Sequence, residues 1–153
     1  MKLIIPPHYK TSVPVQKWSE IKADALAMVH RIEAGKFDGG LWKEAYALSH
    51  SQVSHFPRSF FVVNWKIAEV KKAFRYSIII NPEITRRDSF VLFEEACMSE
   101  PWRKPKKKKR YSLITVSYSV PGWFGCLKKI TETHVGLPSY ISQHELEHFR
   151  GIY

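Results

Sequence analysis

The sequence has few cysteines, no secretion signal and no long apolar run. Its two cysteines, Cys97 and Cys126, cannot form the disulfide framework of a small secreted domain, although either could serve a metal. No apolar stretch approaches the ~18 residues of a membrane-spanning helix. Pro6 and Pro7 interrupt the apolar start too early for a secretory signal. We therefore expect a cytoplasmic protein without a membrane segment.

Acidic residues are also scarce, and the formal net charge is +10. Most of the excess lies in residues 103–110, which contain seven Lys or Arg, and removing them leaves +3. Such a run is usually a solvated loop, which is the interpretation we favour. The alternative is a surface for RNA, because lysines bind phosphates whatever the base sequence.

The chain does have the length and apolar content of one folded domain. It has 153 residues, of which 44% are hydrophobic. A chain of this length buries roughly 70% of the surface that its unfolded form exposes. We expect a single domain over residues 1–153 that needs neither a disulfide nor a metal in order to fold.

Hydrophobic periodicity predicts a helix near each end of the chain, with strands between them. The first helix is expected over residues 15–34, and Gly35 ends it. The last helix is expected to open at Gly136-Leu137-Pro138 and to run to Phe149. Residues 65–74 also have helical spacing. Strands are expected at residues 59–63, 76–80, 111–118 and 124–133. This order indicates an α+β domain.

The strongest chemical signal is the sequence HELEH at residues 144–148. On a helix, His144 and His148 lie one turn apart on the same face and can share one metal ion. Glu145 could then take a proton from a metal-bound water and deliver it to a leaving amine, which hydrolyses an amide. The alternative is an ordinary helix surface that carries two histidines.

A catalytic metal of this kind needs a third protein ligand and an open position. In most enzymes with this helix motif the ligand follows downstream, but here the sequence ends at Tyr153. Cys97 is an upstream candidate. Considered alone, Cys97 is more often a buried cysteine that packs as a small apolar side chain.

Three segments resemble, in order, the three motifs of peptide deformylases. The family motif G-x-G-L-A-A-P-Q is similar to AYALSHSQ at residues 45–52, and E-G-C-L-S is similar to EACMS at residues 95–99. The motif Q-H-E-x-D-H is similar to QHELEH at residues 143–148. The resemblance covers most of residues 41–153. The end of the chain just past the third motif is similar to short bacteriophage members, which lack a long C-terminal helix.

This resemblance implies that Cys97, His144 and His148 bind one divalent metal ion. In the family the ion is usually Fe²⁺ in the cell, and Zn²⁺, Ni²⁺ or Co²⁺ can substitute. Glu145 would be the general acid/base, and the Gln52 side chain and the Met98 backbone N–H would donate to the developing oxyanion. The implied fold has antiparallel and mixed β-sheets packed around a central C-terminal metal-binding helix, with a further helix near the N-terminus.

The implied substrate is the N-formyl group on the initiator methionine of a nascent polypeptide, released as formate by a monomeric enzyme. The methionine side chain needs an apolar pocket. The positions that match its wall are Tyr46, Ala47, Met98, Leu137, Tyr140 and Ile141. The alternative for these residues is plain core, and both interpretations can hold at once.

Several positions depart from the family motifs. Alanine replaces glycine at Ala45, Ala47 and Ala96, which could reshape the edge where the peptide binds. His50 replaces an alanine; it could be a solvent-facing side chain, which we favour, a substrate contact or an extra metal ligand. Glu147 replaces an aspartate and keeps its charge.

The ionic partner of Glu95 is open at this stage. Family members pair this glutamate with a downstream arginine, which would be Arg110. Alternatively, Arg110 simply ends the basic run.

Two rival functions belong to other classes. One is a catalytically silent, metal-stabilised module that binds nucleic acid or the ribosome through residues 103–110; Gln52 and Glu145 argue against it, because a structural site needs neither. The other is a metallopeptidase of another family, against which the upstream Cys97 argues. In a deformylase, residues 103–110 could instead dock the enzyme on ribosomal RNA.

Overall fold

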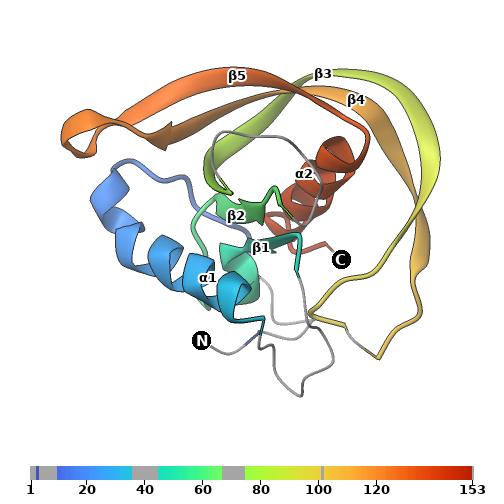
Figure 1. Cartoon of the computed structure of the whole chain (residues 1–153), viewed down its shortest axis with the longest axis horizontal. Helices are drawn as coiled ribbons and strands as arrows, with labels where there is room; N and C mark the ends of the chain where they lie inside the picture. Colours follow the sequence, from blue (N-terminus) through green and yellow to red (C-terminus); the bar gives the residue numbers. More distant parts are fainter. Residues whose placement is uncertain (1–2, 4–9, 36–44, 67–74, 101, 153) are drawn as a thin grey trace.

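A computed structural model describes residues 3, 10–35, 45–66, 75–100 and 102–152. The helices among them are η1 (Trp18–Glu20), α1 (Lys22–Ala34), η3 (His50–Gln52), η4 (Trp123–Gly125) and α2 (Leu137–His148), where η marks a short 3₁₀ helix. The strands are β1 (Ala47–Ser49), β2 (Phe60–Asn64), β3 (Tyr76–Glu95), β4 (Lys106–Pro121) and β5 (Leu127–Val135). All five form one antiparallel sheet in chain order (Figure 1). The expected α+β architecture is confirmed.

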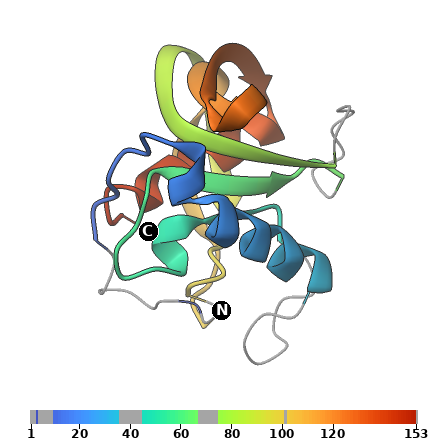
Figure 2. The same ribbon diagram turned by 90° about the vertical axis from the view of Figure 1, so that its left-hand side faces the viewer.

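The two helices pack against opposite faces of the sheet (Figures 1 and 2). Successive side chains of a strand point to opposite faces, and in β2 all of them are buried. Phe60 and Val62 join a core cluster with α1, whereas Phe61 and Val63 join a cluster with α2. The long strands β3, β4 and β5 arch around α2 (Figure 1). Helix α2 therefore lies inside the curve of the sheet.

The first helix starts later than its periodicity predicts. Residues 14–17, before η1, are not helical. Both backbone polar groups of Val15 bond the side chain of Asn81, at 2.8 Å from N–H and 2.7 Å to the carbonyl. This tertiary pairing competes with helix formation at Val15. The expected end is confirmed, because Gly35 has a φ of 58° and its N–H bonds the Ile32 carbonyl.

Two of the predicted strands are longer than expected, whereas β5 begins at Leu127 rather than at residue 124. The predicted segments 76–80 and 111–118 are parts of β3 and β4, which run on to Glu95 and begin at Lys106. Most of the predicted helix 65–74 lies outside the described residues. No helix in the described part of the chain is both long and apolar enough to cross a membrane.

The interpretation of the basic run as a solvated loop is wrong for residues 106–110. These residues form the first part of β4 and pair with residues 91–95 of β3. Strand alternation then divides their side chains: Lys107 and Lys109 are exposed, whereas Arg110 is buried. The sequence did not indicate this strand, because a run of lysines shows no alternation of apolar and polar residues. Its inward-facing lysines are stable only with carboxylate partners, which the folded sheet supplies.

Candidate active site

Helix α2 and the segment after β3 bring three possible metal donors together. The Nε2 atoms of His144 and His148 lie 3.1 Å apart, and Cys97 Sγ lies 3.4 Å from His148 Nε2. All three donor atoms fall within 4.8 Å of one another. Gly136 precedes the first residue of the helix, and its φ of 64° suits glycine. The one-turn spacing predicted for the two histidines is therefore present, and Cys97 meets them.

Glu95 orients the first histidine. Its Oε1 lies 3.2 Å from Nδ1 of His144, so that Nδ1 donates and Nε2 faces Cys97 and His148. Carboxylates often fix the ring of a metal-binding histidine in this way. Burial opposes ionisation of Glu95, but its bonds to His144 and Arg110 outweigh burial and lower its pKa to about 2. Glu95 is therefore a carboxylate across the working pH range.

The groups around His144 favour a positive charge at that donor. Burial works against a charged His144, but hydrogen bonds to Cys97 and Glu95 raise its pKa to about 10. Burial and the nearby His144 keep the pKa of His148 well below its ordinary value. A field that binds a proton at His144 can hold a divalent cation there instead. A thiolate with two imidazoles suits several transition-metal ions, so these residues fit a divalent metal.

Glu145 is a buried carboxyl group on the same helix. Only 4% of its surface is exposed, and its Oε2 has no hydrogen-bond partner among the described residues. Burial raises its pKa to about 7, with the Glu95 charge acting in the same direction and His144 against it. A group with a pKa near neutrality can both take and return a proton.

Gln52 lies next to Cys97, and hydrogen bonds fix both the oxygen and the nitrogen of its side-chain amide. Its Oε1 accepts the Ser49 backbone N–H at 2.8 Å, and its Nε2 donates to Ser99 Oγ at 3.0 Å. The same Nε2 lies 3.7 Å from Cys97 Sγ. No sequence signal identified Ser99 as the partner of Gln52. A fixed amide donor beside a buried carboxyl and three metal donors is an arrangement suited to amide hydrolysis.

The chain matches the polypeptide deformylase family over residues 7–153. It belongs to that family. The family is metal-dependent, and the group of Cys97, His144 and His148 is present here. The matched range includes all three motifs.

Individual members differ from this chain in length and sequence. A peptide deformylase of Thermodesulfovibrio yellowstonii is 33% identical over 75 residues, which is 49% of this chain and 42% of that protein. The matched segment thus spans about two-fifths of this curated relative.

Solved structures match over almost the whole chain. The peptide deformylase of Thermus thermophilus has a TM-score of 0.77 at 24% identity, covering 99% of this chain and 81% of the other. The enzyme of the Vibrio parahaemolyticus bacteriophage VP16T, solved with actinonin, has a TM-score of 0.76 at 26% identity, covering 99% and 98%. The expected fold is confirmed, and a bacteriophage deformylase of nearly the same extent exists.

A cavity of about 310 Å³ opens beside Gln52, His144 and Glu145. All residues expected at the wall of a methionine pocket line it, namely Tyr46, Ala47, Met98, Leu137, Tyr140 and Ile141. Their contact with substrate stays a prediction. Phe93 also lines the cavity and packs on Tyr140, with ring centroids 4.4 Å apart. If the sequence had been interpreted as a strand up to residue 95, alternation would have placed Phe93 on the same face as Glu95.

The pairing of Glu95 with Arg110 is confirmed. Arg110 Nη2 and Nε lie 2.6 and 2.8 Å from the two Glu95 oxygens, and Nη2 also bonds Glu147 at 2.8 Å. Burial alone would lower the pKa of Arg110, but both carboxylates raise it. Glu147, which stands in place of the family's aspartate, thus joins the helix to β4.

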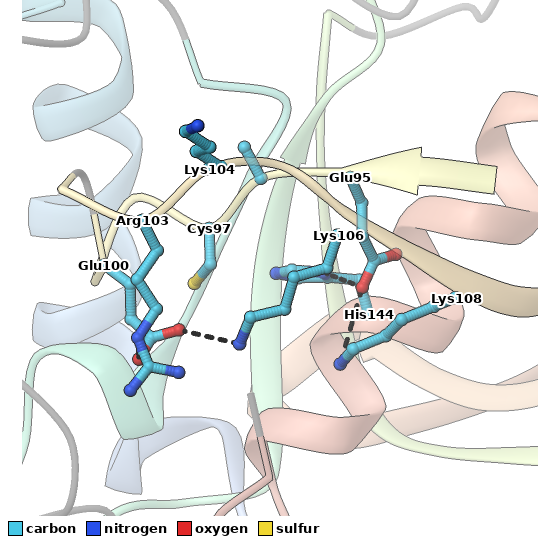
Figure 3. A pocket seen from close by; sticks show the side chains of 9 residues that line it. Glu95, Cys97, Glu100, Arg103, Lys104, Lys106, Lys108 and His144 are labelled. Atoms are coloured by element: carbon cyan, nitrogen blue, oxygen red, sulfur yellow. Dashed lines mark hydrogen bonds and ion pairs between the residues drawn. The ribbon is translucent and has the colours of Figure 1, made fainter.

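Two lysines of β4 complete this ionic network. Lys108 Nζ lies 2.7 Å from Glu147. It also lies 3.5 Å from Glu95, and Lys106 Nζ lies 3.3 Å from the buried Glu100 (Figure 3). These two lysines line a small hollow of about 20 Å³ that also contacts Cys97. The inward half of the basic run therefore supports the site.

His50 is buried, so the favoured interpretation as a solvent-facing side chain is wrong. Only 3% of its surface is exposed. Its Nδ1 accepts the Arg58 backbone N–H at 2.9 Å, its Nε2 lies 3.3 Å from Asp24 Oδ2, and its ring stacks on Phe60. It lies outside both the donor group and the cavity lining. His50 contacts Asp24 of α1, and no local sequence signal predicts this contact.

Proposed function

We propose that this protein is a metal-dependent hydrolase that removes the N-formyl group from the initiator methionine of nascent polypeptides and releases formate. The observation that carries the proposal is the convergence of Gln52, Glu145 and His144 on one cavity. Family membership supports the same activity. It gives no support to the catalytically silent module or to a metallopeptidase of another family.

The residues of this chain have separate tasks in the proposed reaction. Cys97, His144 and His148 would hold the metal, which supplies an activated water and a Lewis acid when bound. Glu145 takes a proton as the water oxygen bonds the formyl carbon. It returns the proton to the amine as the C–N bond breaks, so that formate and a free amino terminus result.

The formyl oxygen and the methionine side chain need their own partners. Gln52 Nε2, held by Ser99, would donate to the developing oxyanion, with the Met98 backbone N–H as the second donor. The cavity, which Tyr140 and Ile141 help to line, would take the methionine side chain. Fe²⁺ is the proposed ion in the cell, with Zn²⁺, Ni²⁺ or Co²⁺ as substitutes. Cytoplasmic residence and a monomeric state stay predictions.

Formate release from a formyl-Met-Ala-Ser peptide tests the reaction. The protein is prepared anaerobically with Fe²⁺, beside Glu145→Gln, which keeps the shape of the side chain. We expect the variant to bind metal with unchanged stoichiometry and to lose activity by roughly 10²- to 10⁴-fold, the usual contribution of a general acid/base. A folded, metal-loaded wild type that releases no formate would reject the proposed function.

We further propose that the outward lysines of β4 dock the enzyme on ribosomal RNA. Lys107 and Lys109 are exposed, whereas Lys106 and Lys108 are paired with carboxylates. Lysine contacts to phosphate are salt-sensitive and independent of base sequence. Co-sedimentation with ribosomes should fall in Lys107→Gln/Lys109→Gln. Equal binding by this double variant and the wild type would reject the idea.

A further inference from the structure

A single buried side chain connects the segment that carries Gln52 to two other parts of the fold. His50 opens η3, the short helix that ends at Gln52, and its carbonyl accepts the Val53 N–H at 3.1 Å. Its ring, in turn, contacts residues far away in sequence. The geometry of this turn is therefore set partly by where the His50 ring is held.

Three separate contacts hold the ring. Nδ1 accepts the Arg58 N–H at 2.9 Å, which requires the neutral ring to carry its proton on Nε2. That Nε2 lies 3.3 Å from Asp24 of α1, so it donates to a carboxylate. The face of the ring stacks on Phe60 with centroids 4.7 Å apart and planes 28° apart. An alanine, the residue of the family motif, could make none of these contacts.

Two side-chain bonds of the turn are local. Ser49 N–H bonds Gln52 Oε1, and the Ser49 and Ser51 hydroxyls bond each other at 2.9 Å. Gln52 Nε2 bonds the loop that carries Cys97, at Ser99 Oγ and at Cys97 Sγ. The pairing of Ser49 with Phe61 anchors the start of the turn to β2. Beyond that anchor, residues 50–52 could shift relative to α1 without the His50 contacts, while the bond from Ser49 N–H to Gln52 stayed intact.

We propose that His50 is a positioning residue for Gln52: bound to Asp24 and Arg58 and stacked on Phe60, it fixes the turn so that the Gln52 amide faces the reacting group. This inference rests on the proposed function for the role of Gln52. His50 touches neither substrate nor metal. Because the donor is used as charge develops on the formyl oxygen, a displaced amide lowers kcat more than it raises KM.

A double-mutant cycle with Gln52 tests the proposal. His50→Ala restores the family residue, and we expect it to lower kcat about tenfold with KM nearly unchanged, since small displacements of catalytic groups cost one to two orders of magnitude. In a Gln52→Ala background the same change should have little further effect, because the donor is already lost. An equal loss of kcat in both backgrounds would overturn the proposal.

A spectroscopic readout separates this proposal from the proposed function. The side-chain NH₂ signals of Gln52, assigned in ¹H–¹⁵N spectra by their loss in Gln52→Ala, should shift or broaden in His50→Ala. Unchanged signals would overturn the proposal even in an active enzyme. Conversely, shifted signals in a protein that releases no formate would reject the reaction and keep the structural link.

Two further variants serve as controls, one in case His50→Ala does not fold and one for the removal of any acidic side chain from α1. Asp24→Ala removes one partner of His50 from a half-exposed position without opening a cavity, and it should shift the same signals by a smaller amount. Glu33→Ala, which removes another acidic side chain of α1, should leave them in place. If His50→Ala does not fold, Asp24→Ala decides the matter: identical Gln52 signals in the two α1 variants would overturn the proposal.

Discussion

Helix α2 and the turn at residues 49–52 place catalytic candidates in the same cavity by different physical means. The helix keeps the family motif, and its position is supported by charges: Arg110 and Lys108 bind Glu147 on the helix and Glu95 beside it. The turn has lost most of its motif and is held by hydrogen bonds and a stacked ring. On the proposal above, His50 fixes the Gln52 amide through contacts that the alanine of the family motif could not make.

The largest expected effect is on stability, through the ionic network that supports α2. Arg110→Met should destabilise the protein by about 3–5 kcal/mol, because it leaves Glu95 and Glu147 without their shared buried partner. Urea denaturation at pH 7 measures this change. The same substitution at the exposed Lys107 should change stability by less than ~0.5 kcal/mol. Similar losses at the two positions would show that the ionic network does not hold α2.

An intermediate effect belongs to the turn. Gln52→Ala should lower kcat by roughly 10²- to 10³-fold, as expected for removing one oxyanion donor. Metal affinity should stay unchanged, because no metal-donor atom is lost. Isothermal titration of the metal-free protein with Zn²⁺ checks the second point, and weaker Zn²⁺ binding would show that the turn and the metal group are not separable.

The smallest effect is the pH response of His50. Burial lowers its pKa, and the charge of Arg58 adds to this shift, whereas Asp24 opposes it. The unfolded chain therefore takes up the proton first, so the stability contribution is present above pH ~6.5 and is lost as the pH falls below that value. The stability of His50→Phe should fall less between pH 7 and 5 than that of the wild type. Urea denaturation of both proteins at pH 7 and pH 5 measures the difference. An equal loss of unfolding free energy in the variant and the wild type would contradict the prediction.

Much of the site could be predicted because its spacing is local. Two histidines and a glutamate within about one helical turn require no knowledge of distant segments, and a helix carries both histidines to one face. Cys97 was different, because the local sequence around it favours a buried core cysteine over a metal ligand. Only the resemblance to a family placed it with the histidines.

The errors arose where distant segments decide the outcome. A lysine run indicates a solvated loop until Glu95, Glu100 and Glu147 are brought against it, and the strand then separates inward from outward side chains. His50 gave no local sign of burial, because its partners lie on α1 and β2 and before β2.

Short-range patterns in the chain were enough to predict the two histidine donors, the acid/base candidate and the α+β class, because local periodicity carries them. Long-range contacts settled which lysines support the site, where Phe93 lines the cavity and how the altered first motif still presents Gln52. Those outcomes depend on burial and on charge pairs between residues far apart in the chain, and a buried charge or ring is stable only where the fold brings its partner to it.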